Sequence, residues 1–224
     1  MYAGRPIIGI VGGVGSGKSY VAGLFGELGC LVVDSDAQVR EAYRDPRVGE
    51  AIRGWWGGGV FHADGTINRS AVAAKVFADL AEKRRLEGLL HPMIAAARER
   101  AMAAAAASDR QVLAFVWDAP LLFEAGLSAQ CDAVVFVDAP LDVRLARVRA
   151  TRGWDEAELL RRENSQMPLD TKRGLSDHHV ENAADAVVDA PGSNDLREQV
   201  RRVLSQILAG STRTPKNVGP QPPP

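Results

Sequence analysis

The sequence predicts a three-layer α/β domain with a parallel sheet of about five strands. Short apolar runs of strand length alternate with longer stretches of helical periodicity, which is typical of parallel sheets covered by helices. A glycine-rich segment, Gly12–Ser19, lies directly between the first apolar run and the first helical pattern. With 224 residues, of which 46% are hydrophobic, the chain is long enough to form such a core and a smaller additional lobe.

Four apolar runs predict strands that are buried on both faces of the sheet. They span Ile7–Val11, Cys30–Val33, Gln111–Trp117 and Ala133–Val137. The first run is followed by glycines and then by an amphipathic helical pattern, which ends at Gly29, a residue suited to a helix C-cap. This strand–glycine–helix order predicts that a ligand binds at the carboxyl end of the first strand, where the glycines lie.

Two helical excursions interrupt the strands. The first, residues 37–110, is too long for a structureless connection, and we expect it to form a helical lobe over the strand ends. Its helical patterns lie at Ala37–Tyr43, Ser70–Asp79, Glu82–Leu90 and Pro92–Ala107. The second excursion, residues 141–175, is rich in arginine. The proline-rich tail, residues 211–224, is predicted to be disordered.

Composition limits the classes of partner. A formal net charge of −1 gives no reason to expect nucleic acid or an acidic membrane surface as a partner. The sequence shows neither a signal peptide nor an apolar run of membrane-spanning length, so we predict a cytoplasmic protein. Cys30 and Cys131 are interpreted as reduced thiols of the core.

Residues Gly12–Ser19 match the pattern G-x-x-x-x-G-K-[ST] of a phosphate-binding P-loop. Glycines allow positive φ angles, so successive N–H groups turn toward phosphate oxygens, and the following helix directs its positive end at the same anion. Lys18 is expected to reach the β- and γ-phosphates, and the Ser19 hydroxyl to bind Mg²⁺. The predicted ATP-binding residues are Gly13, Val14, Gly15, Ser16, Gly17, Lys18, Ser19 and Tyr20.

The P-loop alone does not define the reaction. A GTPase would carry a guanine-selecting Asn-Lys-x-Asp segment, which this chain lacks. A motor would normally carry adjacent Asp-Glu after a hydrophobic strand, whereas the third run ends at Asp118-Ala119-Pro120. The helical lobe and the arginine-rich segment favour a kinase, because phosphoryl transfer needs an acceptor site and a lid that excludes water. The alternative from another class is a nucleotide-gated binding or assembly protein.

Further segments behind the P-loop resemble the dephospho-CoA kinase family, and the resemblance covers most of residues 7–208. The family's Asp-x-Asp is matched at Asp34 and Asp36, and its Gln-x-x-x-x-x-Lys at Gln166 and Lys172. The other matches are Asp64–Arg69 to Asp-Gly-x-[Leu/Ile]-[Asn/Asp]-Arg, Leu89–Ile94 to Leu-x-His-Pro-x-Ile, and Pro120–Glu124 to Pro-Leu-Leu-[Phe/Tyr]-Glu.

The resemblance implies a P-loop fold of the nucleoside-monophosphate-kinase type. It implies a nucleotide-binding core at 5–36, 111–140 and 177–209, a helical acceptor lobe for CoA at 37–110, and a lid at 141–175. The implied reaction moves the γ-phosphoryl group of ATP, with Mg²⁺, onto the ribose 3′-hydroxyl of dephospho-CoA. ATP and dephospho-CoA are therefore the implied partners of a monomer or weak homo-oligomer. Another small-metabolite or nucleoside kinase is the rival within enzymes.

Three carboxylates lie at strand ends, where open α/β sheets bind their ligands. Asp34 is the candidate for accepting or orienting the acceptor hydroxyl proton, and the alternative is a helix N-cap. Asp36 shares that ambiguity, with a role toward the substrate or a Mg²⁺-bound water. Asp118 is the candidate for organising magnesium at the substrate site, and the alternative is an ordinary loop acid before Pro120.

Cationic candidates lie in both excursions. By analogy with related kinases, Arg147 and Arg152 would neutralise the transferring phosphoryl group, because guanidinium donates two parallel hydrogen bonds. They are five residues apart where the family usually has four, which leaves open which of them acts, or whether both lie on a solvated helix face. In the acceptor lobe, Arg69 would pair with a phosphate of CoA. His91 would bind the acceptor or end a helix before Pro92.

Two features depart from the family. Tyr20 stands where related kinases have a threonine whose hydroxyl reaches the α-phosphate, so backbone is expected to replace that contact. The last strand has two candidates. The family's spacing from Lys172 favours 177–182, whereas apolar character favours 186–189, and we favour the first slightly.

Overall fold

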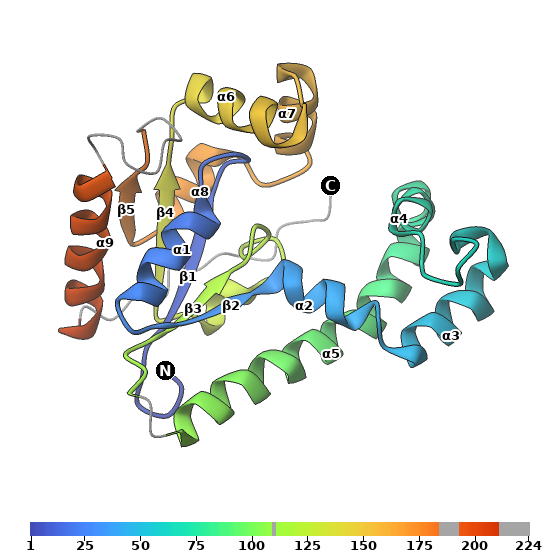
Figure 1. Ribbon diagram of the computed structural model, residues 1–224, viewed down its shortest axis with the longest axis horizontal. Coiled ribbons are helices and arrows are strands. Elements are labelled where there is room, and N and C mark those ends of the chain that lie inside the picture. Colours follow the sequence, from blue (N-terminus) through green and yellow to red (C-terminus); the bar gives the residue numbers. More distant parts are fainter. Residues whose placement is uncertain (109–110, 184–192, 211–224) are drawn as a thin grey trace. The chain divides into compact units, whose positions relative to one another are not determined.

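The computed structural model describes residues 1–108, 111–183 and 193–210. The chain divides into two compact units (Figure 1). The sheet unit combines Met1–Val33 with the chain from Ala105 onward, and the helical unit is Asp34–Ala104. The predicted disordered tail, 211–224, and the alternative last strand, 186–189, lie outside the described residues.

Within the described residues the sheet has five strands in the order β2-β3-β1-β4-β5. They are β1 (Ile7–Gly12), β2 (Leu31–Asp34), β3 (Phe115–Asp118), β4 (Ala133–Asp138) and β5 (His178–Glu181). β1 pairs in parallel with both β3 and β4, and β4 pairs in parallel with β5. The predicted parallel α/β sheet is therefore confirmed, and β5 lies within 177–182, one of the two candidate segments for the last strand.

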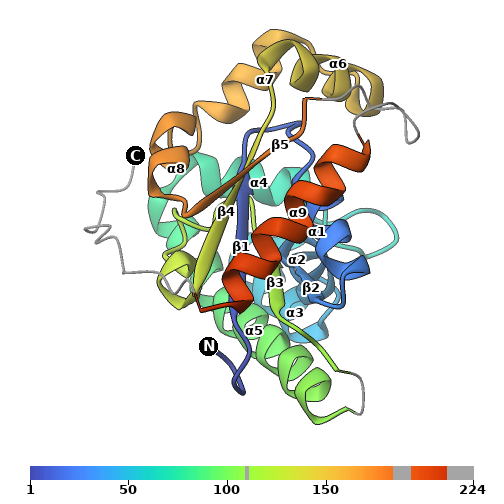
Figure 2. The same cartoon turned by 90° about the vertical axis from the view of Figure 1, so that its left-hand side faces the viewer.

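The sheet is covered on one face by α1 (Lys18–Glu27) and α9 (Ser193–Leu208), which lie side by side in Figure 2. Ile8 and Ile10 of β1 join their core cluster and are fully buried. On the opposite face the chain comes close at Gly9, where an added Cβ would lie 2.5 Å from Leu122 Cδ2. All six β1 residues are buried, which explains why its sequence is a continuous apolar run.

Three helices lie between β4 and β5 in the sheet unit. They are α6 (Leu141–Arg152), α7 (Glu156–Glu163) and α8 (Leu169–Leu175), and a short 3₁₀ turn, η2 (Leu127–Gln130), precedes β4. α6 ends at Gly153 with φ of 67°, and the Asp155 side chain caps α7 by accepting the Glu158 N–H at 2.8 Å. Buried Val148 and Leu159 pack these helices against Val14 of the P-loop. The segment proposed as a lid thus has a fixed contact with the loop.

The helical unit contains α2 (Ser35–Ala42), α3 (Pro46–Trp56), the 3₁₀ turn η1 (Gly57–Val60), α4 (Arg69–Ala78) and nearly all of α5 (Leu80–Ala107). The predicted patterns did not include α3. The start of α3 has a local helix signal, because Asp45 caps the helix and Pro46 occupies its first turn. Buried Val48 and Ile52, four residues apart, face the unit's core.

Helix α5 is continuous where the sequence predicted a break between His91 and Pro92, so that prediction was wrong. Leu86, Leu90 and Ile94 are buried on one face, in a core shared with α3 and α4. Burying each such side chain contributes about 1.5–3 kcal/mol. Together they exceed the cost of an interior proline, about 3 kcal/mol. No helix in the described part of the chain is both long and apolar enough to cross a membrane.

Candidate active site

The P-loop connects β1 to α1 and is shaped by glycines. Gly15 and Gly17 have φ of 78° and 85°, a region that other residues rarely adopt. An added Cβ on Gly15 would lie 2.7 Å from the Arg144 carbonyl oxygen of α6, and on Gly17 2.3 Å from Asn182 Nδ2. Glycine is therefore required at both positions by conformation and by space. α1 begins at Lys18, so its positive end lies at the loop.

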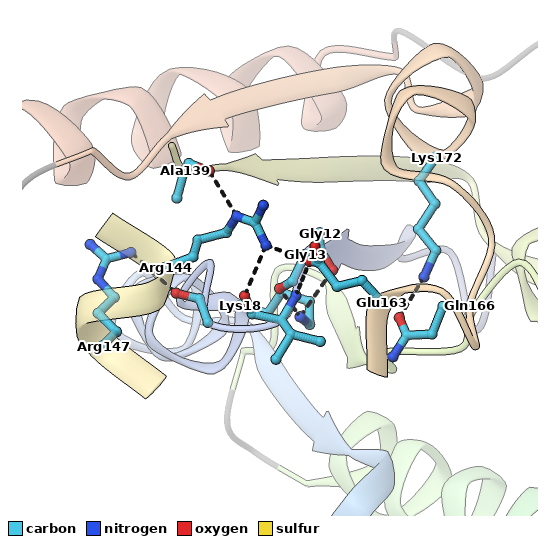
Figure 3. A network of polar contacts seen from close by, with 11 residues as sticks. Gly12, Gly13, Lys18, Ala139, Arg144, Arg147, Glu163, Gln166 and Lys172 are labelled. Carbon is cyan, nitrogen blue, oxygen red and sulfur yellow. Dashed lines mark hydrogen bonds and ion pairs between the residues drawn. The ribbon is translucent and has the colours of Figure 1, made fainter. Parts of the chain in front are cut away.

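Lys18 lies folded over the loop. Its Nζ donates to the carbonyl oxygens of Gly12 and Gly13 at 3.0 and 2.8 Å (Figure 3). Burial lowers the pKa of Lys18 from 10.5 to about 8, although the Asp118 carboxylate acts to raise it. The Arg152 cation also lowers it, so the charge of Arg152 acts at the end of this side chain. The ammonium group of Lys18 is thus placed at the phosphate-binding loop and bonded to its backbone.

The side chains of Ser19 and Asp118 are in contact at the carboxyl end of β3. The Ser19 hydroxyl donates to Asp118 Oδ2 at 2.6 Å, although the two residues are 99 positions apart in sequence. Asp118 is 6% exposed and ends β3, next to β1 in the sheet. The structure thus brings together the two oxygen-bearing side chains that the sequence had assigned to magnesium. Within the described residues, no cluster of three or more His, Cys, Asp or Glu side chains is arranged to hold a metal ion.

Arg147 contacts the outer side of the P-loop. Its guanidinium donates to the carbonyl oxygens of Gly15 and Ser16 at 3.4 and 3.3 Å. It also donates to the backbone oxygen and Oδ1 of Asn182, at 3.0 and 3.2 Å, while Asn182 Nδ2 donates to the Ser16 carbonyl oxygen at 2.8 Å. Asn182 was not among the predicted site residues. Arg147 and Asn182 together connect α6, the loop and the end of β5.

Arg152 has different surroundings. It ends α6, is exposed, and stacks on the Trp154 ring with a distance of 4.7 Å to the ring centroid. Arg162 stacks on the same ring at 4.0 Å, and Trp154 packs against the cluster that contains Val14. Of the two predicted lid arginines, Arg152 is the one that stacks on a ring and changes the pKa of Lys18, whereas Arg147 bonds to backbone.

Arg144 and Glu163 were both missed by sequence reasoning. They form a buried ion pair, with side chains 7% and 12% exposed, beside the loop (Figure 3). Arg144 also donates from Nε to the Ala139 carbonyl oxygen at 3.1 Å. Nothing in the sequence distinguishes Arg144 from the other arginines of α6, since which face is buried depends on tertiary packing.

Lys172 is fully buried and bonded to the segment after β3. Its Nζ lies 2.8 Å from Glu124 Oε1, 3.0 Å from Gln166 Oε1 and 3.1 Å from the Pro120 carbonyl oxygen. The positive charge of Lys172 also lowers the pKa of Lys18. Two segments that carry the family resemblance, Pro120–Glu124 and Gln166–Lys172, are therefore joined by one lysine.

The remaining predicted residues belong to the helical unit. Asp34 caps α2, with Oδ1 accepting the Ala37 N–H at 2.9 Å, and its Oδ2 lies 3.4 Å from Arg40 Nη2. Asp36 is exposed in the first turn of the same helix. The capping role of Asp34 is thus present, and its role toward an acceptor stays a prediction.

Arg69 and His91 lie on α4 and α5 of the same unit. Arg69 begins α4, is exposed, and lies over the Tyr43 ring at 5.4 Å. Burial raises the pKa of Tyr43, and the Arg69 charge opposes that shift. His91 is exposed within α5, so it does not end a helix as one reading of the sequence had allowed. Tyr20, on α1 of the sheet unit, is 43% exposed.

Comparison with known proteins identifies the family. The dephospho-CoA kinase profile matches residues 6–187. A dephospho-CoA kinase of Anaeromyxobacter dehalogenans is 39% identical over 96% of this chain and 98% of its own length. That of Corynebacterium efficiens is 37% identical over 90% of this chain and 96% of its own length.

Solved structures share the fold. The crystal structure of TT1252 from Thermus thermophilus superposes with a TM-score of 0.73 at 32% identity, covering 93% of this chain and 99% of that one. Dephospho-CoA kinase from Campylobacter jejuni has a TM-score of 0.60 at 20% identity, over 91% of this chain and 98% of that chain, and so shows the shared fold. The resemblance, the P-loop kinase fold and the assignment as a phosphotransferase are all confirmed. The chain belongs to the dephospho-CoA kinase family.

Proposed function

We propose that this chain transfers the γ-phosphoryl group of ATP to the ribose 3′-hydroxyl of dephospho-CoA, which gives ADP and CoA, the last step of coenzyme A synthesis. The observation that carries the proposal is the arrangement of Lys18, Ser19 and Asp118 around the P-loop in a member of this family. Little covalent chemistry is asked of the protein, because phosphoryl transfer is promoted by positioning and by neutralisation of charge.

The P-loop binds the ATP phosphates in this proposal. The N–H groups of the loop and the start of α1 provide partial positive charge, and Lys18 adds a full one. Lys18 donates two hydrogen bonds, to the carbonyl oxygens of Gly12 and Gly13, and exchanges them for bonds to phosphate oxygens when the nucleotide binds. A phosphate anion also favours the protonated form of a lysine whose pKa burial has lowered.

Mg²⁺ fits the oxygen atoms of Ser19 and Asp118. A hydroxyl and a carboxylate 2.6 Å apart are hard donors, and Mg²⁺ commonly takes one or two protein oxygens while keeping waters and phosphate oxygens as its other ligands. When bound, the ion would neutralise charge on the β- and γ-phosphates. Asp118 is positioned for this by β3, and Ser19 by the first turn of α1.

The two predicted arginines receive separate roles in the proposal. Arg152 closes on the transferring phosphoryl group, since its guanidinium is exposed and its charge acts on Lys18. Arg147 holds the outer side of the loop through the carbonyl oxygens of Gly15 and Ser16. The proposal assigns neutralisation of the phosphoryl group to Arg152 because the guanidinium of Arg147 is bonded to loop backbone.

The acceptor binds to residues of the helical unit in the same proposal. Asp34 orients the 3′-hydroxyl, because a carboxylate accepts about four hydrogen bonds and the contacts with Ala37 and Arg40 leave capacity for another. Arg69 binds a phosphate of the CoA moiety, and Asp36 and His91 contribute polar contacts. ATP and dephospho-CoA are its partners, without nucleic acid or membrane, and a monomer or weak homo-oligomer is expected.

A cytoplasmic location completes the proposal. Cys30 and Cys131 are both buried, and burial raises the pKa of Cys30 to about 12, which makes the Cys30 thiol unreactive. Free thiols are usual in a reducing compartment.

One assay tests the proposed reaction. ADP release is measured with ATP·Mg²⁺ alone, with dephospho-CoA, and with a panel of nucleosides and shikimate. We expect dephospho-CoA alone to stimulate ADP release, and Lys18→Ala to abolish that stimulation. Stimulation by another acceptor would support the rival small-metabolite kinase. ATP binding without stimulation by any acceptor would support a nucleotide-gated binding protein.

A further inference from the structure

Val14, in the first half of the P-loop, is held on three sides by the helices that follow β4. Its N–H donates to Glu163 Oε1 at 3.1 Å, and its carbonyl oxygen accepts from Arg144 Nη1 at 3.3 Å. Its side chain packs with buried Val148 and Leu159. Both backbone groups of one loop residue are thus fixed by side chains 130 and 149 positions away in sequence.

The two side chains that hold Val14 also hold each other. Glu163 Oε1 accepts from Arg144 Nη1 as well as from Val14, and Arg144 Nε is tied to the Ala139 carbonyl oxygen at 3.1 Å (Figure 3). Because the pair is almost fully buried, removing one partner would leave a buried charge without its counterion, which is strongly unfavourable. The contact is therefore built into the fold of α6 and α7.

The loop is shaped to admit this pair. A Cβ on Gly13 would lie 2.9 Å from Glu163 Oε1 and 3.0 Å from Arg144 Nη1. Any larger residue at position 13 would push the carboxylate or the guanidinium away from Val14. Glycine at this position thus serves the ion pair as well as the approach of a phosphate.

The Glu163 carboxylate beside the phosphate-binding loop could have either of two effects. It either fixes the conformation of the loop or occupies the position that a phosphate group must take. The first is favoured, because the charge of Glu163 is neutralised by Arg144, and displacing the carboxylate would strand a buried arginine. Two fixed backbone groups also reduce the conformational freedom that the loop must lose on binding nucleotide.

We propose that Glu163, held by Arg144, is a positioning residue that preorganises the Gly13–Val14 half of the P-loop for nucleotide phosphates. The inference rests on the proposed function only in that the loop binds ATP or ADP. It does not depend on the identity of the acceptor.

The test measures ADP·Mg²⁺ affinity by calorimetry, together with thermal unfolding, in the full chain. Glu163→Gln keeps an oxygen for the Val14 N–H but leaves Arg144 unpaired, and we expect it to lower the Tm and weaken ADP binding about tenfold. The double variant Arg144→Met with Glu163→Met removes both charges, so we expect its Tm to recover while ADP binding stays about tenfold weaker. In both variants KM for ATP should rise more than kcat falls. Glu156→Gln is the matched control, because it removes a carboxylate from an exposed position of the same helix.

Two results would overturn the inference. Wild-type ADP affinity in the folded double variant would show that the pair serves stability alone. Tighter ADP binding by Glu163→Gln would show that the carboxylate competes with phosphate. Binding is measured without an acceptor, so failure of dephospho-CoA to stimulate the wild-type enzyme would reject the proposed reaction and leave this result unaffected.

Discussion

The P-loop of the sheet unit and the aromatic rings of the helical unit hold arginine in different ways, although the sheet unit also stacks Arg152 and Arg162 on Trp154. In the sheet unit, Arg144 and Arg147 donate to backbone carbonyl oxygens of the P-loop. In the helical unit, three arginines lie over aromatic rings, with centroid distances of 4.0, 5.4 and 4.4 Å for Arg53 on Phe61, Arg69 on Tyr43 and Arg85 on Trp55. The first arrangement occupies the N–H groups with protein, whereas stacking uses the face of the guanidinium and leaves its N–H edge available.

The difference between arginines bonded to the loop backbone and arginines stacked on rings suggests that the two units bind different kinds of ligand. A loop whose backbone is already bonded to buried side chains has little freedom left to lose, so it suits a ligand group of fixed geometry such as a triphosphate. Exposed arginines on rings can change rotamer at small cost, which suits a long and flexible acceptor. We therefore expect substitutions in the sheet unit to affect nucleotide binding and transfer, and those in the helical unit to affect the acceptor.

The largest effect is expected for Lys18→Ala. Removing a cation placed where negative charge develops should slow phosphoryl transfer at least about 100-fold while the protein stays folded. Initial rates of ADP release, with circular dichroism as the control for folding, provide the measurement. Near-normal turnover in a folded variant would mean that Lys18 is not the phosphate lysine.

Asp34→Asn tests the helical unit's contribution to chemistry. Asparagine caps helices about as well as aspartate, so the contact with the Ala37 N–H is retained and stability should change little. If the carboxylate orients the acceptor hydroxyl, kcat should fall by about 100-fold with little change in ATP affinity. Unchanged kcat in the folded variant would leave Asp34 as a helix cap alone.

Arg152→Lys and Arg147→Lys separate a phosphoryl-binding arginine from a loop-binding one. Lysine cannot reproduce a planar two-point contact, so Arg152→Lys should lower kcat about tenfold with ATP affinity nearly unchanged. Arg147→Lys should instead raise the Kd for ADP and lower the Tm, because it loses bonds to the loop and to Asn182. The division of roles fails if both variants lower kcat alone.

Hydrogen exchange over residues 141–175 tests which part of this segment moves when ligands bind. A lid should gain protection when ATP and an acceptor analogue are both bound, and less with ATP alone. We expect the gain near Arg152 and Trp154, and little at Lys172, which is already fully buried. Uniform protection of the whole segment without ligands would argue against a lid.

Arg69→Ala should give the smallest effect. We expect KM for dephospho-CoA to rise several-fold, about the 1 kcal/mol typical of an exposed charge contact, with KM for ATP unchanged. Arg53→Ala is the matched control, since Arg53 is also exposed and stacked on a ring of the helical unit. Equal changes for both variants would assign the effect to general charge rather than to a phosphate site.

Local patterns predicted the parts of the site that depend on local geometry. The P-loop follows from a strand, glycines and a helix start, and Asp118 follows from the end of an apolar run, so the meeting of Ser19 with Asp118 was foreseeable. The last strand was foreseeable from its spacing to Lys172. The P-loop and the strand ends are local features, and the parallel pairing of β1 with β3 brings Ser19 and Asp118 together.

The features that the sequence did not reveal depend on tertiary packing. Arg144, Glu163 and Asn182 are polar residues whose burial is decided by which helix face meets the loop. Continuity of α5 through Pro92 likewise depends on the buried stripe that includes Leu90 and Ile94. Propensity indicates a break there, and packing of the surrounding helices overrides it.

Identification of the product is the decisive test of the proposed reaction. The enzyme is incubated with ATP·Mg²⁺ and dephospho-CoA, and the product is examined by ³¹P NMR and by coelution with authentic CoA. We expect one new phosphate monoester on the ribose 3′-oxygen, formed in equal amount to ADP and absent with Lys18→Ala. A phosphate at any other position, or ADP formed without phosphorylated acceptor, would contradict the proposed reaction.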